Sequence, residues 1–177
     1  MNKRNFMFLA LLGAMVLNGH GEVRAQDANR WHNVDVNQQN RAPRRAAFFA
    51  FENQDKAQAF EKKNSANYLS MEGTWKFNFV KDYNKRPVNF FAANFDDSQW
   101  KDFPVPGLFE LNGYGDATYK NIGYAWATQF DPNPPYISEL NNYTGSYRRT
   151  FDLPKDWKGK DVYFHVGSAT SNLTLWV

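Results

Sequence analysis

Residues 146–177 read SYRRTFDLPKDWKGKDVYFHVGSATSNLTLWV and carry the clearest fold signal in the chain. Apolar and polar residues alternate in three runs, which cover 146–153, 161–166 and 173–177. A period of two is typical of strands that bury one face. Arg149 falls on the apolar face of the first run, so we expect it to lie at the rim of a sheet or to have a partner.

The same period of two occurs earlier, at residues 74–79, which read TWKFNF. The alternation predicts a strand that places Trp75, Phe77 and Phe79 on one face. A shorter edge strand is predicted at 101–105. The chain therefore reads as an all-β domain.

One short helix is predicted at residues 53–63, where Asn53 or Asp55 can cap the first turn. The pair Asp96 and Asp97 stands next to Ser98. We expect this pair to cap a turn rather than to act in catalysis, because Asp and Ser side chains readily bond to nearby backbone groups.

Residues 104–126 read PVPGLFELNGYGDATYKNIGYAW and mix Gly and Pro with aromatic and amide side chains. Gly and Pro at these intervals predict a loop. Flat aromatic rings suit the apolar C–H faces of sugars, and amides and carboxylates suit hydroxyl groups. Alternatively, these aromatic residues only attach a long loop to a sheet core, since buried aromatics are common.

The first 25 residues have the features of a secretory signal peptide. Lys3 and Arg4 precede an apolar run that is short for a membrane span, and small residues precede a predicted cut between Ala25 and Gln26. We therefore expect an exported protein, periplasmic or secreted. The alternative is an anchor that is not cleaved.

The composition after this leader excludes several functions. The leader holds three of the 21 basic and one of the 18 acidic residues, so the remainder is close to neutral and gives no reason to expect binding to nucleic acid or to a membrane. The chain has no Cys, and His32 and His165 lack metal-ligand spacing. We therefore expect no metal site within the chain.

The motif P-G-L-F-E-L-N-G-Y-G-D-A-T-Y-K-N-I-G-Y resembles a loop of glycoside hydrolase family 2, in particular of the amino-terminal domain of bacterial β-galactosidases. The resemblance implies that Asn121 reaches into the galactose site of a neighbouring catalytic barrel. It also implies loop support from Tyr119, Ile122 and Tyr124, with Tyr119 holding the loop against the domain.

Further motifs resemble the same family: W-H-N, F-D-D-S-Q-W, S-M-E-G-T-W-K-F and the stretch 146–177. They imply a jelly-roll β-sandwich of the galactose-binding-domain type. The expected organisation is a signal peptide at 1–25, an extended arm at 26–52 and the sugar-binding domain at 53–177. Because the family's pattern continues after the position of Val177, we expect a sandwich that is incomplete at the C-terminus, in a fragment of a longer enzyme.

Glycoside hydrolysis needs two carboxylates that face each other across the scissile bond. The part after the leader has five Glu, and none follows an Asn as the family's acid/base Glu does. We therefore assign no catalytic residue to this chain. By the resemblance, catalysis belongs to a barrel downstream, and Mg and Na ions belong to the full-length enzyme.

The implied partners are a β-galactoside sugar, the downstream domains of the same chain and further copies in a homo-oligomer. Three alternatives remain open at this point. The chain is a stand-alone carbohydrate-binding module, a domain that only braces the enzyme, or part of a family 2 β-glucuronidase or β-mannosidase.

Overall fold

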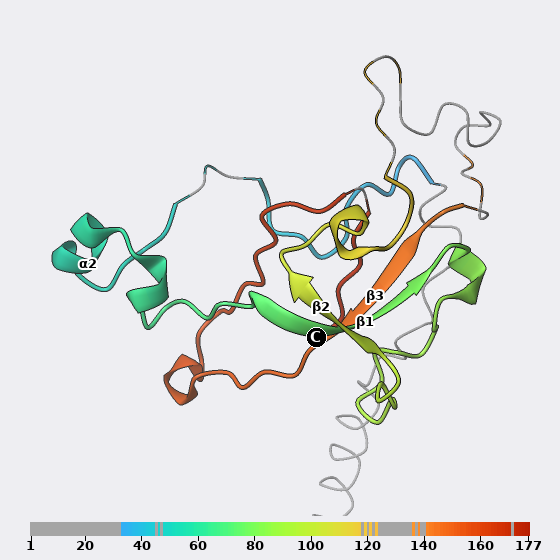
Figure 1. Ribbon diagram of the computed structural model, residues 1–177. Helices are drawn as coiled ribbons and strands as arrows, with labels where there is room; N and C mark the ends of the chain where they lie inside the picture. The colour runs from blue at the N-terminus through green and yellow to red at the C-terminus, as the bar shows by residue number, and fades with distance from the viewer. Residues whose placement is uncertain are drawn as a thin grey trace, which may run out of the picture. The chain divides into compact units, whose positions relative to one another are not determined.

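The computed structural model describes residues 33–44, 46, 48–117, 119, 121, 123, 136, 138, 141–170 and 172–177 (Figure 1). All of them belong to one compact unit, Trp31–Val177. The predicted leader, with its cut before Gln26, lies outside the described residues. None of the helices in the described ranges is long and apolar enough to cross a membrane.

A three-stranded antiparallel sheet organises this unit. The strand β1, Gly73–Val80, lies between β2, Lys101–Val105, and β3, Thr144–Arg148. Phe77 of β1 faces Lys101 of β2 and Tyr147 of β3. The predicted strands at 74–79 and 101–105 are confirmed, and the fold is all-β, as expected of an incomplete sandwich.

One face of the sheet carries a cluster of packed rings, which we call the aromatic core. Its members are Phe77, Phe79, Phe103, Phe109, Tyr114 and Tyr147. Phe77 and Phe103 are only 1% exposed, and their ring centroids lie 4.4 Å apart. Burial raises the pKa of Tyr147 to about 12. Burying a Phe side chain contributes about 1.5–3 kcal/mol, so this face dominates the stability of the sheet.

The predicted common face of Trp75, Phe77 and Phe79 is confirmed. Trp75 packs edge-on against Tyr147, and Phe79 lies 5.3 Å from the ring of Phe109. Arg149 lies at the rim of this face, as expected, and donates to the carbonyl oxygens of Met71 and Glu72, each at 2.8 Å.

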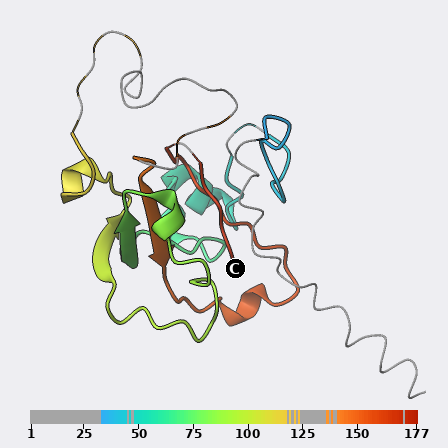
Figure 2. The ribbon, with the colours of Figure 1, turned by 90° about the vertical axis from the view of Figure 1, so that its right-hand side faces the viewer.

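The prediction of three strands in 146–177 is confirmed only for part of the first run. The first ends at Arg148 rather than Leu153, and the runs 161–166 and 173–177 form no strand (Figure 2). Alternation is a local property, whereas a strand also requires a hydrogen-bonded neighbour. The side chains at 161–170 are exposed, so these residues have no buried face.

The predicted helix is confirmed but is shorter than expected. The helix α2 runs over Gln54–Ala59, and the Asn53 side chain caps it by accepting from the Lys56 backbone N–H at 2.9 Å. Phe60 ends it in the left-handed region, at φ 55°. Single 3-10 turns follow at η2, Lys62–Asn64; η3, Tyr83–Lys85; η4, Glu110–Asn112; and η5, Lys155–Trp157.

Candidate functional site

The first half of the predicted sugar-binding loop is attached to the sheet by aromatic residues. The ring of Phe109 lies 5.7 Å from Phe77, and that of Tyr114 lies 4.9 Å from Phe77. The alternative interpretation, that aromatic residues fix the loop to the core, is therefore correct for Phe109 and Tyr114. Both rings pack on the core and are only partly exposed.

Local hydrogen bonds shape this half of the loop around η4. The Asn112 side chain donates to the Leu108 carbonyl at 2.8 Å, and the Tyr114 N–H donates to the Phe109 carbonyl at 2.9 Å. Gly113 takes φ 80°, a left-handed conformation that residues with a side chain rarely adopt. These bonds turn the chain so that Phe109 and Tyr114 both reach the sheet.

A second connection joins the loop to the residues just before β3. The Tyr143 hydroxyl donates to the Asp116 carboxylate, and this bond raises the pKa of Tyr143. Gly115 lies against the Tyr143 ring, where a Cβ would come within 3.1 Å of a ring carbon. The sequence motifs did not reveal this pair, because the partners are 27 positions apart.

The second half of the loop contains the predicted contact residue. Asn121 is exposed, and the Tyr119 side chain is 89% exposed. The loop support that the structure describes comes from Phe109, Tyr114 and Asp116, and the support expected from Tyr119 stays a prediction. The other two predicted support residues, Ile122 and Tyr124, lie outside the described residues.

The adjacent carboxylates Asp96 and Asp97 bind different partners. Asp96 accepts from the Ser98 backbone N–H at 2.9 Å, which lowers the pKa of Asp96 and confirms the predicted turn cap. The same prediction is wrong for Asp97, whose carboxylate pairs with Arg148 Nε at 2.8 Å. Arg148 also donates to the carbonyls of Phe90 and Ala92, so this guanidinium attaches residues 90–97 to β3.

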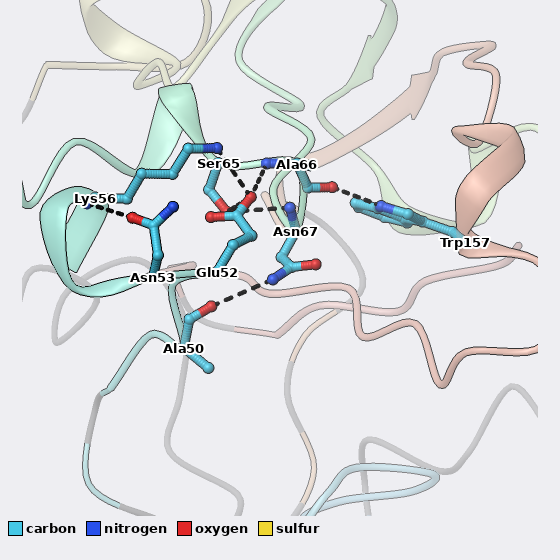
Figure 3. Close-up of polar contacts among 8 residues, drawn as sticks. All are labelled: Ala50, Glu52, Asn53, Lys56, Ser65, Ala66, Asn67 and Trp157. Carbon is cyan, nitrogen blue, oxygen red and sulfur yellow. Dashed lines mark hydrogen bonds and ion pairs between the residues drawn. The ribbon is translucent and has the colours of Figure 1, made fainter.

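A polar network around Glu52 joins the end of the predicted arm to two later segments (Figure 3). The Glu52 carboxylate accepts from Ser65 Oγ at 3.0 Å, from the Ala66 backbone N–H and from Lys56 Nζ at 3.3 Å. Asn67 donates to the Ala50 carbonyl at 3.4 Å. Only the cap residue Asn53 within this region was recognisable from the sequence.

Hydrogen bonds to the ionised carboxylate control its charge state. The bond from its own backbone N–H has the largest effect, followed by the bonds from Ala66, Ser65 and Lys56. Together they lower the pKa of Glu52 to about 2, against the opposing effect of burial. Because every donor in the network binds the anionic form, this carboxylate has a structural role.

Metal binding has no support within the described part of the chain, where no group of three or more His, Cys, Asp or Glu side chains could hold an ion. Asn and Tyr side chains of the loop can donate and accept hydrogen bonds. The arrangement can therefore present polar groups to a sugar from a loop whose first half is attached to the sheet.

Known proteins match the chain over this same region. Residues 68–177 match the family model for "Glycosyl hydrolases family 2, sugar binding domain". The chain is 30% identical over 159 residues to a β-galactosidase of Priestia megaterium, a match covering 89% of this chain and 15% of that protein. It is 32% identical over 143 residues to a β-galactosidase of Lactobacillus delbrueckii subsp. bulgaricus, a match covering 81% of this chain and 14% of that protein.

The large subunit of a β-galactosidase from Leuconostoc lactis is 32% identical over 130 residues, covering 66% of this chain and 21% of the subunit. The chain thus spans between about a seventh and a fifth of the length of these relatives. The match of the sugar-binding domain confirms the resemblance inferred from the motifs.

Proposed function

The chain belongs to the sugar-binding domain family of glycosyl hydrolases family 2, and we propose that it is the non-catalytic sugar-binding domain of an exported β-galactosidase-like enzyme. The β-galactosidases that it resembles support this assignment. In the proposal, the enzyme removes terminal β-galactose residues in carbohydrate catabolism. The carboxylates that cleave the bond belong to another part of the full-length protein.

The proposed contribution of this domain is the loop that carries Asn121. The observation that supports it is the contrast between an attached first half, held by Phe109 and Tyr114, and an exposed second half with Tyr119 and Asn121. An attached loop holds an exposed amide in place at a smaller entropic cost on binding. Asn121 then hydrogen-bonds a galactose hydroxyl in the active site.

The variant Asn121→Ala in the full-length protein tests this role. We expect kcat/KM for a nitrophenyl β-galactoside to fall by an amount equivalent to about 1–3 kcal/mol, as for a hydrogen bond removed from a dry site. The melting temperature should stay unchanged, because Asn121 is exposed. Asn94→Ala, at an exposed asparagine outside the loop, is the matched control.

Equal kcat/KM values for the two variants would contradict a role for Asn121 in the active site. The family assignment would not be affected. The same assay decides the substrate class when nitrophenyl β-galactoside, β-glucuronide and β-mannoside are compared. We expect the β-galactoside to be hydrolysed fastest. Hydrolysis of none of the three would favour a stand-alone binding module.

The export that we propose rests on the leader at 1–25. Its test is amino-terminal sequencing of the protein recovered from the periplasm or the medium, where the first residue should be Gln26. Recovery of uncleaved protein in the cytoplasm would contradict it. Homo-oligomer formation, proposed from the family resemblance, is tested separately by the mass of the full-length protein in solution.

A further inference from the structure

An open groove lies beside η5, among residues that the proposed active-site loop does not include. Leu153, Pro154, Lys155, Trp157 and Lys158 line it, and its volume is about 470 Å³. Small-molecule sites commonly have volumes of about 300–1,000 Å³, with mostly apolar walls and a few polar groups. The groove therefore falls within the size range of small-molecule sites and has a mostly apolar lining.

The indole of Trp157 is held in place at its polar edge. Its Nε1–H donates to the Ala66 carbonyl at 2.7 Å (Figure 3). The N–H of the same Ala66 donates to the Glu52 carboxylate, which also accepts from Ser65 Oγ at 3.0 Å. The hydrogen-bond network thus fixes the backbone that orients the ring.

The faces of this ring differ from those of other indoles in the chain. Trp75, Trp100 and Trp176 each pack against another aromatic ring. Within the ranges that the structure describes, no aromatic ring or cation is seated on Trp157, which is only partly buried. A fixed, partly exposed indole provides a flat apolar surface that suits the C–H face of a sugar ring.

Two lysines lie among the residues that line this groove. Lys155 and Lys158 line the groove on either side of Trp157 in the sequence, and no described carboxylate pairs with either. The acidic residues of the same stretch, Asp152, Asp156 and Asp161, are not part of the lining. The polar groups that the groove offers through its side chains are therefore cationic.

We propose that this groove binds an anionic sugar residue, one that bears a carboxylate or a sulfate group. The apolar face of the sugar ring stacks on Trp157, and the acidic group lies near the ammonium groups of Lys155 and Lys158. Lysine acts on such a group as a point charge, so both acid types fit. This inference does not depend on the role proposed for Asn121.

Calorimetric titration of the full chain tests the proposal with four probes: a galacturonate tetrasaccharide, a sulfated galactose tetrasaccharide, a neutral galactose tetrasaccharide and inorganic polyphosphate. We expect at least one acidic saccharide to bind about tenfold more tightly than the neutral one and more tightly than polyphosphate. Raising the salt from about 0.05 to 0.5 M should weaken this binding. The acidic saccharide that binds more tightly identifies the acid group.

The double variant Lys155→Ser/Lys158→Ser should lose about tenfold in affinity for the acidic saccharide. Lys160→Ser, which removes one positive charge from the same stretch outside the groove, should leave the affinity unchanged. Trp157→Phe should weaken the binding of both acidic and neutral saccharides. Equal losses for Lys160→Ser and the double variant, equal binding of polyphosphate, or no preference for acidic saccharides would each overturn the proposal.

Discussion

The aromatic core and the Glu52 network both join segments that are distant in sequence, but they use different chemistry. The core joins β1, β2, β3 and the loop through apolar rings, and two of its members are 1% exposed. The network joins the arm, α2 and residues 65–67 through hydrogen bonds, and the Glu52 side chain is 26% exposed.

The two regions contribute differently, since the core supplies stability and the network fixes the positions of segments. Removing ring surface from water contributes free energy in proportion to the buried area, whereas an exposed hydrogen bond replaces a similar bond to water. The core therefore determines whether the sheet forms. The network determines how residues 50–52 are held against residues 65–67 and how Trp157 is oriented, and its strength depends on pH.

Phe77→Ala should have the largest effect, because it removes the ring at the centre of the core. We expect a loss of about 3–5 kcal/mol in the free energy of unfolding, from lost burial and from the cavity that remains. Chemical denaturation of the full chain measures it. Phe48→Ala, at a ring that is 66% exposed, is the control, and an equal loss there would refute the central role of the core.

Gly145→Ala probes the packing of the same core with an added methyl group. A Cβ at this position would lie 2.6 Å from a ring carbon of Phe77 and 2.7 Å from one of Phe109. Overpacking of this kind costs about 1–3 kcal/mol, measured as a lower denaturation midpoint. Gly167→Ala, where no atom lies within 4 Å of the new Cβ, should be close to neutral.

Glu52→Gln tests the network through its pH dependence. The folded-state pKa of Glu52, about 2, lies below the ordinary value of 4.5, so the stability from its charge is present above pH 4.5. It is lost as the pH falls from about 4.5 to about 2. The difference in melting temperature between wild type and Glu52→Gln should therefore shrink on acidification. Glu61→Gln is the control, and a pH-independent difference for Glu52→Gln would contradict the mechanism.

Lys76→Ala should have the smallest effect. Its Nζ lies 2.9 Å from an Asp102 carboxylate oxygen across β1 and β2, but both side chains are well exposed, at 43% and 65%. Exposed ion pairs contribute about 0–1 kcal/mol and weaken with salt. Denaturation at low and high salt should show a small loss that disappears at high salt. A loss of stability as large as that of Gly145→Ala would show that this ion pair contributes more than an exposed pair should.

Local sequence patterns predicted the elements whose partners are also present. Residues 74–79 and 161–166 both alternate, yet only the first run becomes a strand, β1, because β2 and β3 pair with it on both sides. The cap of α2 was predictable because Asn53 bonds to a backbone group only three residues away. Pattern alone does not reveal whether a neighbouring strand is available.

The candidate site shows the same division. The composition of residues 104–126 predicted a loop, and the motifs correctly identified the family. The partners of Asp116 and Asp97 were not predictable, because each lies in a distant segment, and the packing of Phe109 on the core was only one of two interpretations. A residue type indicates which bonds are possible, and the fold selects the one that forms.

The sequence by itself determined the all-β class, the central strand with its aromatic face, the short capped helix and the family. These features depend on side-chain order over a few residues or on motifs that are contiguous. Only the tertiary structure decided that Phe109 and Tyr114 face the core, that Asp97 pairs with Arg148, and that Trp157 is oriented by Ala66. Such contacts join residues tens of positions apart, and their energy is gained only once the chain has brought the partners together.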